Sequence, residues 1–263
     1  MGRKSWLTAF SLLLLLGCGA GKREGLISTR PIELPEWFWK PPLIRSVPVA
    51  VGYSPSFLDP EKAIASAEEN GVENLAKQIC VRIKGERIFL KDELGIKFMG
   101  EKIEEIVPEE MLENLKRNHV LLDAFVSERG TIALVATKKI PVSHRTIRPG
   151  GRPKWLREIP REKGFLYATG QSQRGVYEVN SWLMAEREAR VELAMSLKAK
   201  VRGLDKKIDA WSEGVFTSGT DITLEGIQIV ERWYDPDTKM CHVLARVPLK
   251  TSGASASRKT IRR

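Results

Sequence analysis

One spacing recurs along this 263-residue chain and limits what the chain can fold into. The phrase PEWF at residues 35–38 returns as PKWL at 153–156, so their tryptophans lie 118 residues apart. The same offset carries Gly52 in VAVGYS onto Gly170 in YATGQS. Four further pairs share it: Ala67 with Ala185, Gly71 with Ala189, Leu75 with Leu193, and Ile79 with Leu197. One offset held over so many positions predicts two copies of one module, each entered through the tryptophan phrase.

The two copies also end alike. ALVATKKIP (133–141) aligns with HVLARVPL (242–249) at an offset of 109, through Ala136 and Ala245. The second copy is therefore about nine residues shorter than the first, and the difference falls in its middle.

Each copy opens with a short strand followed by a long helix. Strands are predicted at 47–53 and 165–169, where valine and aromatic residues run up to a glycine. Helices are predicted at 59–80 and 176–200, because apolar or small residues recur there every three or four positions. Asp59 followed by Pro60 is a helix start signal. The small residues in the middle of each apolar stripe would let the helix approach a sheet closely.

Further strands complete each copy. Residues 81–90 and 201–211 look like strands, and the first copy then inserts a polar helical stretch, 101–117, interrupted at Pro108. Each copy closes with a β-hairpin, whose turns are predicted at 128–130 and 235–238.

The predicted fold class is α+β, with two tandem modules that each pack a long helix on a small antiparallel sheet. The hairpin strands are apolar on both faces, so both faces need cover. The module's own helix covers one face, and the simplest cover for the other is the second module. The residues that show this in the first copy are Leu121, Leu122, Ala124, Phe125 and Val126.

The first eighteen residues have the order of a secretory signal. Arg3 and Lys4 precede an apolar run at 6–16, which is too short to span a bilayer as a helix. The following LLGC (15–18) resembles a bacterial lipobox. In such proteins a peptidase cuts between the equivalents of Gly17 and Cys18, and the new N-terminal cysteine carries acyl chains. Gly19 in the next position favours sorting to the outer membrane, by the same resemblance.

These patterns divide the chain into six parts. Residues 1–17 are predicted as a lipoprotein signal peptide and 18–34 as a lipidated tether. The modules are expected at 35–141 and 153–249, joined by a Pro- and Gly-rich linker at 142–152, with a disordered basic tail at 250–263.

Charge and compartment narrow the partners. The chain carries 43 Lys and Arg against 33 Asp and Glu, and removal of residues 1–17 leaves a net +8. A basic protein held on a membrane meets anionic headgroups, acidic glycans and cell-wall polymers rather than nucleic acid. After Cys18, only Cys80 and Cys241 remain. They either pair across the two copies or, as is more common, stand as single buried cysteines.

Two stretches carry a weak signal for ligand chemistry. The loop GQSQRG (170–175) lies between a strand and a helix, but Val176 and Tyr177 follow instead of the Lys and Ser/Thr of a phosphate loop. A weak anion site aided by Arg174 and a plain turn both remain open. Asp235 and Asp237 near Cys241 and His242 suggest a metal, yet calcium-loop and zinc spacings are absent, so we interpret the aspartates as turn residues.

No catalytic set is recognisable, and we expect no enzyme, cofactor or resident metal. The sequence has no nucleophile elbow, and no histidine stands in a triad setting. The carboxylate pairs Glu104–Glu105 and Glu109–Glu110 are interpreted as solvated charges.

Most tryptophans are expected in the core. Trp39 has no repeat equivalent, and we also consider contact with lipid headgroups for it. The six tryptophans weighed are 37, 39, 155, 182, 211 and 233.

The second copy resembles the LPP-twenty lipoprotein family of bacterial outer membranes. The resemblance rests on its PxW phrase, ATGQS, EARVELAMSL and IVERWYDPDTKMCHVLARVPL, and the first copy shares it through PEW, AVGYS and ALVATKKI. It implies a dodecin-like α+β module, similar to domains of flagellar ring and basal-disk proteins. The chain departs from single-module members by carrying two copies.

These observations favour a non-catalytic envelope lipoprotein that faces the periplasm, attached to the membrane through its N-terminal lipid. Its function is expected to be binding another envelope protein or its own copies through open sheet edges and an uncovered face, with a flagellar association as the specific version. The alternative is a lipoprotein that binds the cell wall or an acidic glycan, using the net +8 charge and the basic tail.

Overall fold

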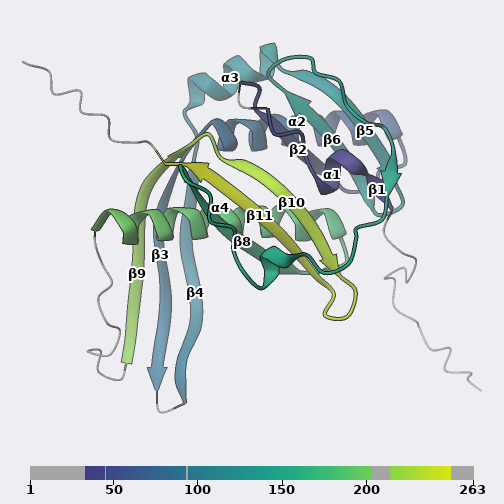
Figure 1. The fold of residues 1–263 in the computed structure, drawn as a ribbon. Coiled ribbons are helices and arrows are strands. Elements are labelled where there is room, and N and C mark those ends of the chain that lie inside the picture. The colour runs from purple at the N-terminus through teal and green to yellow at the C-terminus, as the bar shows by residue number, and fades with distance from the viewer. Residues whose placement is uncertain (1–32, 45, 93, 203–213, 250–263) are drawn as a thin grey trace, which may run out of the picture. The chain divides into compact units, whose positions relative to one another are not determined.

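The computed structural model describes residues 33–44, 46–92, 94–202 and 214–249 (Figure 1). The fold is mixed α+β, built from small antiparallel sheets and helices. The predicted signal peptide, its cleavage point at Gly17, the lipid-attachment residue Cys18, most of the tether and the basic tail lie outside the described residues. The two predicted modules are called the first half (35–141) and the second half (153–249) below.

The two halves contain sheets with the same strand order. The first sheet is β2 (Val49–Ser54), β6 (Gly130–Ala136) and β5 (Val120–Ser127), in that spatial order. The second sheet is β8 (Phe165–Gln173), β11 (Met240–Pro248) and β10 (Gln228–Asp235). In each sheet the last strand in sequence lies between the other two, and all pairings are antiparallel.

A long helix follows the first strand of each sheet, as predicted. Helix α2 (Pro60–Ile79) begins after Asp59, whose side chain accepts hydrogen bonds from the backbone N–H groups of Glu61 and Lys62. Helix α4 (Glu178–Arg202) occupies the same place in the second half. Each helix buries the central three residues of its predicted stripe: Ala67, Gly71 and Leu75 in α2, and Ala185, Ala189 and Leu193 in α4.

A glycine in each first strand permits close contact with the helix. A Cβ atom at Gly52 would lie 1.9 Å from the carbonyl oxygen of Ala67, and one at Gly170 would lie 2.1 Å from that of Ala185. Real Cβ atoms do not approach backbone that closely, so only glycine fits at either position. The two contacts are 118 residues apart in the chain, as the spacing analysis predicts.

The strand register corrects one predicted alignment. Gly52 pairs with Ala133, and Gly170 pairs with Val243, so the last strands correspond at an offset of 110 rather than 109. Ala136 and Ala245, which the sequence aligned, therefore lie on opposite faces of their sheets. A slip of one residue always has this effect in a strand, and two alanine-rich segments offer little to fix the register.

Strands β5 and β10 correspond to each other residue by residue, including the position of a β-bulge. The register of β5 shifts between Leu121 and Asp123, and that of β10 shifts between Ile229 and Glu231, at an offset of 108 in both positions. In each half, the tryptophan of the PxW phrase donates a hydrogen bond to a carboxylate at this bulge. Trp37 Nε1 donates to Asp123 Oδ2 at 2.8 Å, and Trp155 Nε1 donates to Glu231 Oε2 at 3.0 Å.

Helix α4 covers two sheets. One side packs on the second sheet, and the other contacts β2 and β6 of the first sheet. The short helix α1 (Glu36–Trp39) fills the remaining space, where the Phe38 ring lies 5.2 Å from the Trp182 ring of α4. The second half therefore covers β2 and β6 of the first sheet, as expected, whereas Leu121 and Val126 of β5, which were expected to need cover, are exposed by 36% and 45%.

The second sheet is covered on its outer face by a short segment. The 3₁₀ turn η1 (Lys154–Leu156) places Trp155 against Trp233 and Leu244. A two-stranded pairing of β1 (Leu34–Pro35) with β7 (Thr146–Ile147) ties the first described residues to the predicted linker.

A third sheet joins strands from both halves. Its order is β4 (Gly95–Ile106), β3 (Cys80–Asp92) and β9 (Gly214–Glu225). Figure 1 shows these long strands continuing past α4. We call this sheet the ribbon.

The ribbon corrects the predicted polar helix at 101–117. Residues 101–106 belong to β4, and only α3 (Glu109–Asn118), after Pro108, is helical. Burial alternates along this stretch, since Glu101, Ile103 and Glu105 are less exposed than Lys102, Glu104 and Ile106. Glu101 and Glu105 bind arginines of α4, so the period of two of a strand fits it. Of the strand predicted at 201–211, Val201 and Arg202 end α4, and the remainder lies outside the described residues.

The glycine contacts give a direct test of this packing. We expect Gly52→Ala and Gly170→Ala each to lower the free energy of unfolding by about 1–3 kcal/mol, because the added methyl group forces helix and strand apart. Gly151→Ala is the control, since a Cβ there has no neighbour within 4 Å, and its effect should stay within about 0.5 kcal/mol. Urea unfolding measures all three. Equal stability of the three variants would contradict the close helix–sheet contact.

Candidate interaction surfaces

The second sheet ends the stack of layers. By register, Val51, Tyr53 and Ile132, on the face of the first sheet that is turned away from α2, correspond to Thr169, Gln171 and His242, on the face of the second sheet that is turned away from α4. Positions that are apolar or aromatic where α4 packs are thus more polar where no further helix follows. Trp155 also covers part of this face. The second sheet therefore lacks the uncovered apolar face that we expected to bind a partner. The remaining surfaces are strand edges, the ribbon and the loops.

A buried polar cluster links the two halves beneath these surfaces. Glu186 of α4 accepts hydrogen bonds from the Tyr53 hydroxyl and from Arg232 Nη2, the latter at 2.5 Å. Arg232 Nη1 donates to the carbonyl oxygen of Phe38 at 2.6 Å. Burial raises the pKa of Tyr53 well above its ordinary value. Burial alone would lower the pKa of Arg232, but Tyr53 and Glu186 hold it above the ordinary value. The cluster therefore pairs the buried Arg232 with Glu186 of α4.

A second ion pair extends the cluster into the ribbon. Arg190 binds Glu105 with two hydrogen bonds of 2.5 and 3.1 Å, and Lys77 of α2 lies 3.5 Å from the same carboxylate. Burial would raise the pKa of Glu105, but Arg190 and Lys77 hold it below its ordinary value. The interpretation of Glu105 as a solvated charge is wrong, whereas Glu104, Glu109 and Glu110 are exposed as expected.

These ion pairs act on the fold rather than on a ligand. Tyr53, Glu186, Arg190 and Arg232 are all buried, and none of them lines a described cavity. These residues were not among the predicted functional residues. The signal available was the place of Glu186 and Arg190, each directly after an alanine of the predicted apolar stripe (Ala185 and Ala189), which indicates buried partners elsewhere.

The cluster predicts a large cost for removing one partner. We expect Glu186→Ala to lower the free energy of unfolding by about 3–5 kcal/mol, because Arg232 then stays buried without its counter-ion. Glu69→Ala in α2 is the matched control, since Glu69 is exposed, and its effect should be within about 0.5 kcal/mol. Urea denaturation measures both. Similar values for the two variants would show that the cluster does not tie the halves together.

Ion pairs attach the part of the ribbon nearest α4 to that helix. Arg87 of β3 pairs with Glu188, Glu192 and Glu101, at 2.9 Å to Glu188 and 3.2 Å to Glu101. Arg187 of α4 also pairs with Glu101. Burial raises the pKa of Glu188, and the neighbouring carboxylates add to the effect despite Arg87.

Beyond Arg87 the ribbon exposes apolar side chains. We call residues 94–100 the ribbon tip. Its large apolar side chains are exposed by 86% at Leu94, 47% at Ile96, 57% at Phe98 and 60% at Met99. Neighbouring exposed apolar residues of this kind mark a surface that binds a protein or a membrane. The ribbon tip is therefore a candidate interaction surface.

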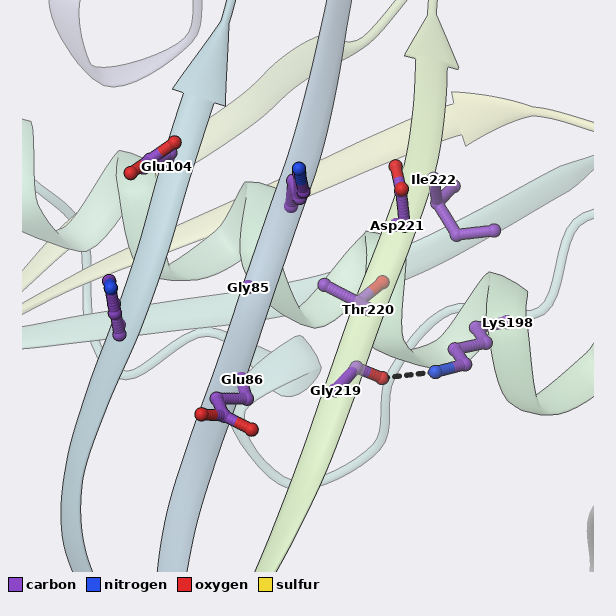
Figure 2. A pocket seen from close by; sticks show the side chains of 10 residues that line it. Gly85, Glu86, Glu104, Lys198, Gly219, Thr220, Asp221 and Ile222 are labelled. Atoms are coloured by element: carbon purple, nitrogen blue, oxygen red, sulfur yellow. Dashed lines mark hydrogen bonds between the residues drawn. The ribbon is translucent and has the colours of Figure 1, made fainter.

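The ribbon edges are less available than the tip. β4 and β9 are its outer strands, and an outer strand presents unpaired backbone groups. Lys198 of α4 donates to the carbonyl oxygen of Gly219 in the middle of β9, as Figure 2 shows. A hollow of about 550 Å³ lies here, lined by equal numbers of lysines and carboxylates, which select no one charge of ligand. Those residues are Lys84, Lys102, Lys198, Glu86, Glu104 and Asp221.

Most of the predicted glycine loop at 170–175 is strand, because Gly170–Gln173 continue β8, so Gly170 does not close the strand as a turn. The Arg174 side chain, considered for a weak anion site, is buried and lies 2.8 Å from Glu178. The backbone N–H of Gly175 donates to Ser181 Oγ at 2.9 Å. The Arg174 charge and the Gly175 N–H are therefore paired within the protein, whereas Arg174 Nε is buried without a hydrogen-bond partner.

The aspartates of the last hairpin also form a turn, as predicted. Asp235 Oδ1 accepts from the backbone N–H groups of Asp237 and Thr238 at 3.0 and 3.3 Å. His242 lies beside the Trp233 ring, and burial lowers its pKa. Within the described part of the chain, no group of three or more His, Cys, Asp or Glu could hold a metal. Cys80 and Cys241 are not joined by a disulfide, and Cys241 is fully buried.

The alternative of headgroup contact for Trp39 is wrong. Trp39 is buried, and its Nε1 donates to the carbonyl oxygen of Ile147 at 3.1 Å. Its ring packs on Trp182 of α4. Only the first half receives α4 in this way, which explains why Trp39 has no repeat equivalent. Trp37, Trp155, Trp182 and Trp233 lie in the core as predicted, and Trp211 falls outside the described residues.

Comparison with family models, with curated proteins and with solved structures finds no match for this chain. None of the helices among the described residues has the length and apolar character needed to cross a membrane.

Proposed function

We propose that this chain is a lipid-anchored protein of the bacterial envelope, built from two copies of a dodecin-like module, that acts as a non-catalytic protein-interaction or assembly module. The observation that carries the duplicated module is the recurrence of one constellation in both halves: the strand order, the glycine–helix contact and the bulge closed by a tryptophan. The resemblance to the LPP-twenty lipoproteins supports the same assignment.

The signal-like N-terminus supports the location. Under this proposal Cys18 carries the lipid after cleavage at Gly17, and the protein faces the periplasm from the outer membrane. The sealed polar cluster supports a function that depends on surfaces rather than on reactive groups. The partner is another envelope protein or a second copy of the chain, and association with a flagellum is the specific version.

The anchor can be tested in cells. We expect the wild-type chain to take up labelled palmitate and to lose residues 1–17, whereas Cys18→Ala takes up no label and keeps its signal peptide. Cys80→Ala is the control and should retain the label. Mass spectrometry of the N-terminus reports the cleavage point. Recovery of wild-type protein with Met1 intact in the cytoplasm would overturn the anchor.

The ribbon tip gives the test of the interaction. We expect cross-linking in intact envelopes to yield discrete products that a Phe98→Ser, Met99→Ser double variant loses, because the apolar contact surface is gone. Phe57→Ser with Leu58→Ser is the matched control, since these residues are also exposed but lie at the start of α2. Loss of the products in both variants, or in neither, would exclude the ribbon tip as the contact.

The alternative function is binding to the cell wall or to an acidic glycan. The net +8 charge of residues 18–263 and the basic tail favour it. Salt-sensitive binding to purified cell wall that is lost on neutralising the tail would support this alternative.

A further inference from the structure

The excess positive charge of the chain lies in two segments, the tail at 250–263 with a net +5 and a segment within the fold. Residues 138–163, called the basic strap, contain nine Lys and Arg against two Glu, a net +7. Residues 34–137 and 164–249 together carry a net −5. All nine cations of the strap are exposed: Lys138, Lys139, Arg145, Arg148, Arg152, Lys154, Arg157, Arg161 and Lys163.

The strap cations are available for an external anion. Among the described residues, only Arg148 of the nine forms an ion pair, with Glu33 at 2.7 Å. One of the two acidic residues of the strap, Glu162, pairs with Arg246 outside it. Elsewhere in the fold, arginines such as Arg87 and Arg232 are engaged by carboxylates. The strap thus presents its charge to solvent.

The strap is held in place along its length. Figure 1 follows it from the end of β6, past β1, to the start of β8. β7 pairs with β1, the indole of Trp233 donates to the carbonyl oxygen of Gly150 at 3.1 Å, and Trp155 is buried against the second sheet. The cations therefore form an array fixed to the fold.

The N-terminal tether joins the fold at this array. Leu34 pairs with Ile147, and the backbone N–H of Glu36 donates to the carbonyl oxygen of Arg145 at 2.8 Å. Residues 18–33 can span at most about 55 Å when fully extended. A lipid on Cys18 would keep the middle of the strap within that distance of the bilayer surface.

We propose that the basic strap is the surface through which the protein lies on the anionic headgroups of the membrane that holds its N-terminus. This inference rests on the proposed lipid anchor. Lipid headgroups are favoured over an acidic glycan because residues 34–36, which follow the tether, are hydrogen-bonded to the strap, so the anchored bilayer is the nearest anionic surface. Basic residues near such a surface are attracted within about a Debye length, about 8–10 Å. The contact orients the fold with its strap toward the lipid.

The test uses the chain from Gly19 onward, without acyl groups, and vesicles of phosphatidylethanolamine and phosphatidylglycerol in a 3:1 ratio. We expect the chain to bind these vesicles, to bind less as salt rises, and to bind phosphatidylcholine vesicles weakly. The triple variant Arg152→Gln, Lys154→Gln, Arg157→Gln should bind about 100-fold more weakly, at roughly a fivefold loss for each cation removed near the surface. Co-sedimentation measures the partition.

The matched control is Lys84→Gln, Lys102→Gln, Lys200→Gln. These three exposed cations lie outside the strap and are not ion-paired in the described part of the chain, so we expect binding within about twofold of the unsubstituted chain. An equal loss in this control would show undirected attraction and overturn the proposal. So would a loss confined to Lys259→Gln, Arg262→Gln, Arg263→Gln in the tail.

Two further outcomes separate this inference from the proposed function. Strap-dependent binding to purified cell wall, with no binding to anionic vesicles, would overturn the lipid surface in favour of the glycan. Because the chain in the vesicle assay carries no acyl group, its result does not depend on acylation of Cys18. Failure of palmitate labelling with strap-dependent vesicle binding would therefore remove the anchor and leave the lipid contact of the strap supported.

Discussion

Helix α4 is buried between two sheets, and the rest of the structure depends on how its polar groups are satisfied there. A charge on a covered side of such a helix is out of contact with water, so it needs a partner within the fold. Glu186 and Arg190 find theirs in Arg232 and Glu105, which come from the second sheet and the ribbon. Such pairs add little net stability against apolar side chains of the same size, but an incomplete pair is costly. Any other placement of the two halves would therefore leave one of these charges buried without its partner, at a large cost in free energy.

Much of each half could be predicted from the sequence because the signals there are local or repeated. The contacts of Gly52 and Gly170 follow from one spacing, and Asp59 and the Asp235 turn act on their own neighbours. The predicted offset of the last strands was wrong by one residue. The aligned residues, Ala136 and Ala245, are identical, whereas the true register depends on pairing across the sheet.

The candidate surfaces were harder to predict because they depend on contacts between the halves. Residues 101–106 read as a polar helix until α4 supplies arginines for Glu101 and Glu105. Trp39 looked exposed because nothing in the second half corresponds to it, yet it packs on Trp182. The cations of the basic strap were visible in the sequence, but their position beside the first described residues depends on the pairing of β1 with β7.

The ribbon has a consequence for the order of folding. β3 and β4 leave the ribosome more than 100 residues before β9, so the middle strand of that sheet lacks one neighbour until almost the whole polypeptide has been made. Contacts between residues so distant in sequence form slowly during folding. A half-built sheet of this kind invites mispairing with other chains, so the interval before β9 is added is when the chain is most exposed to aggregation.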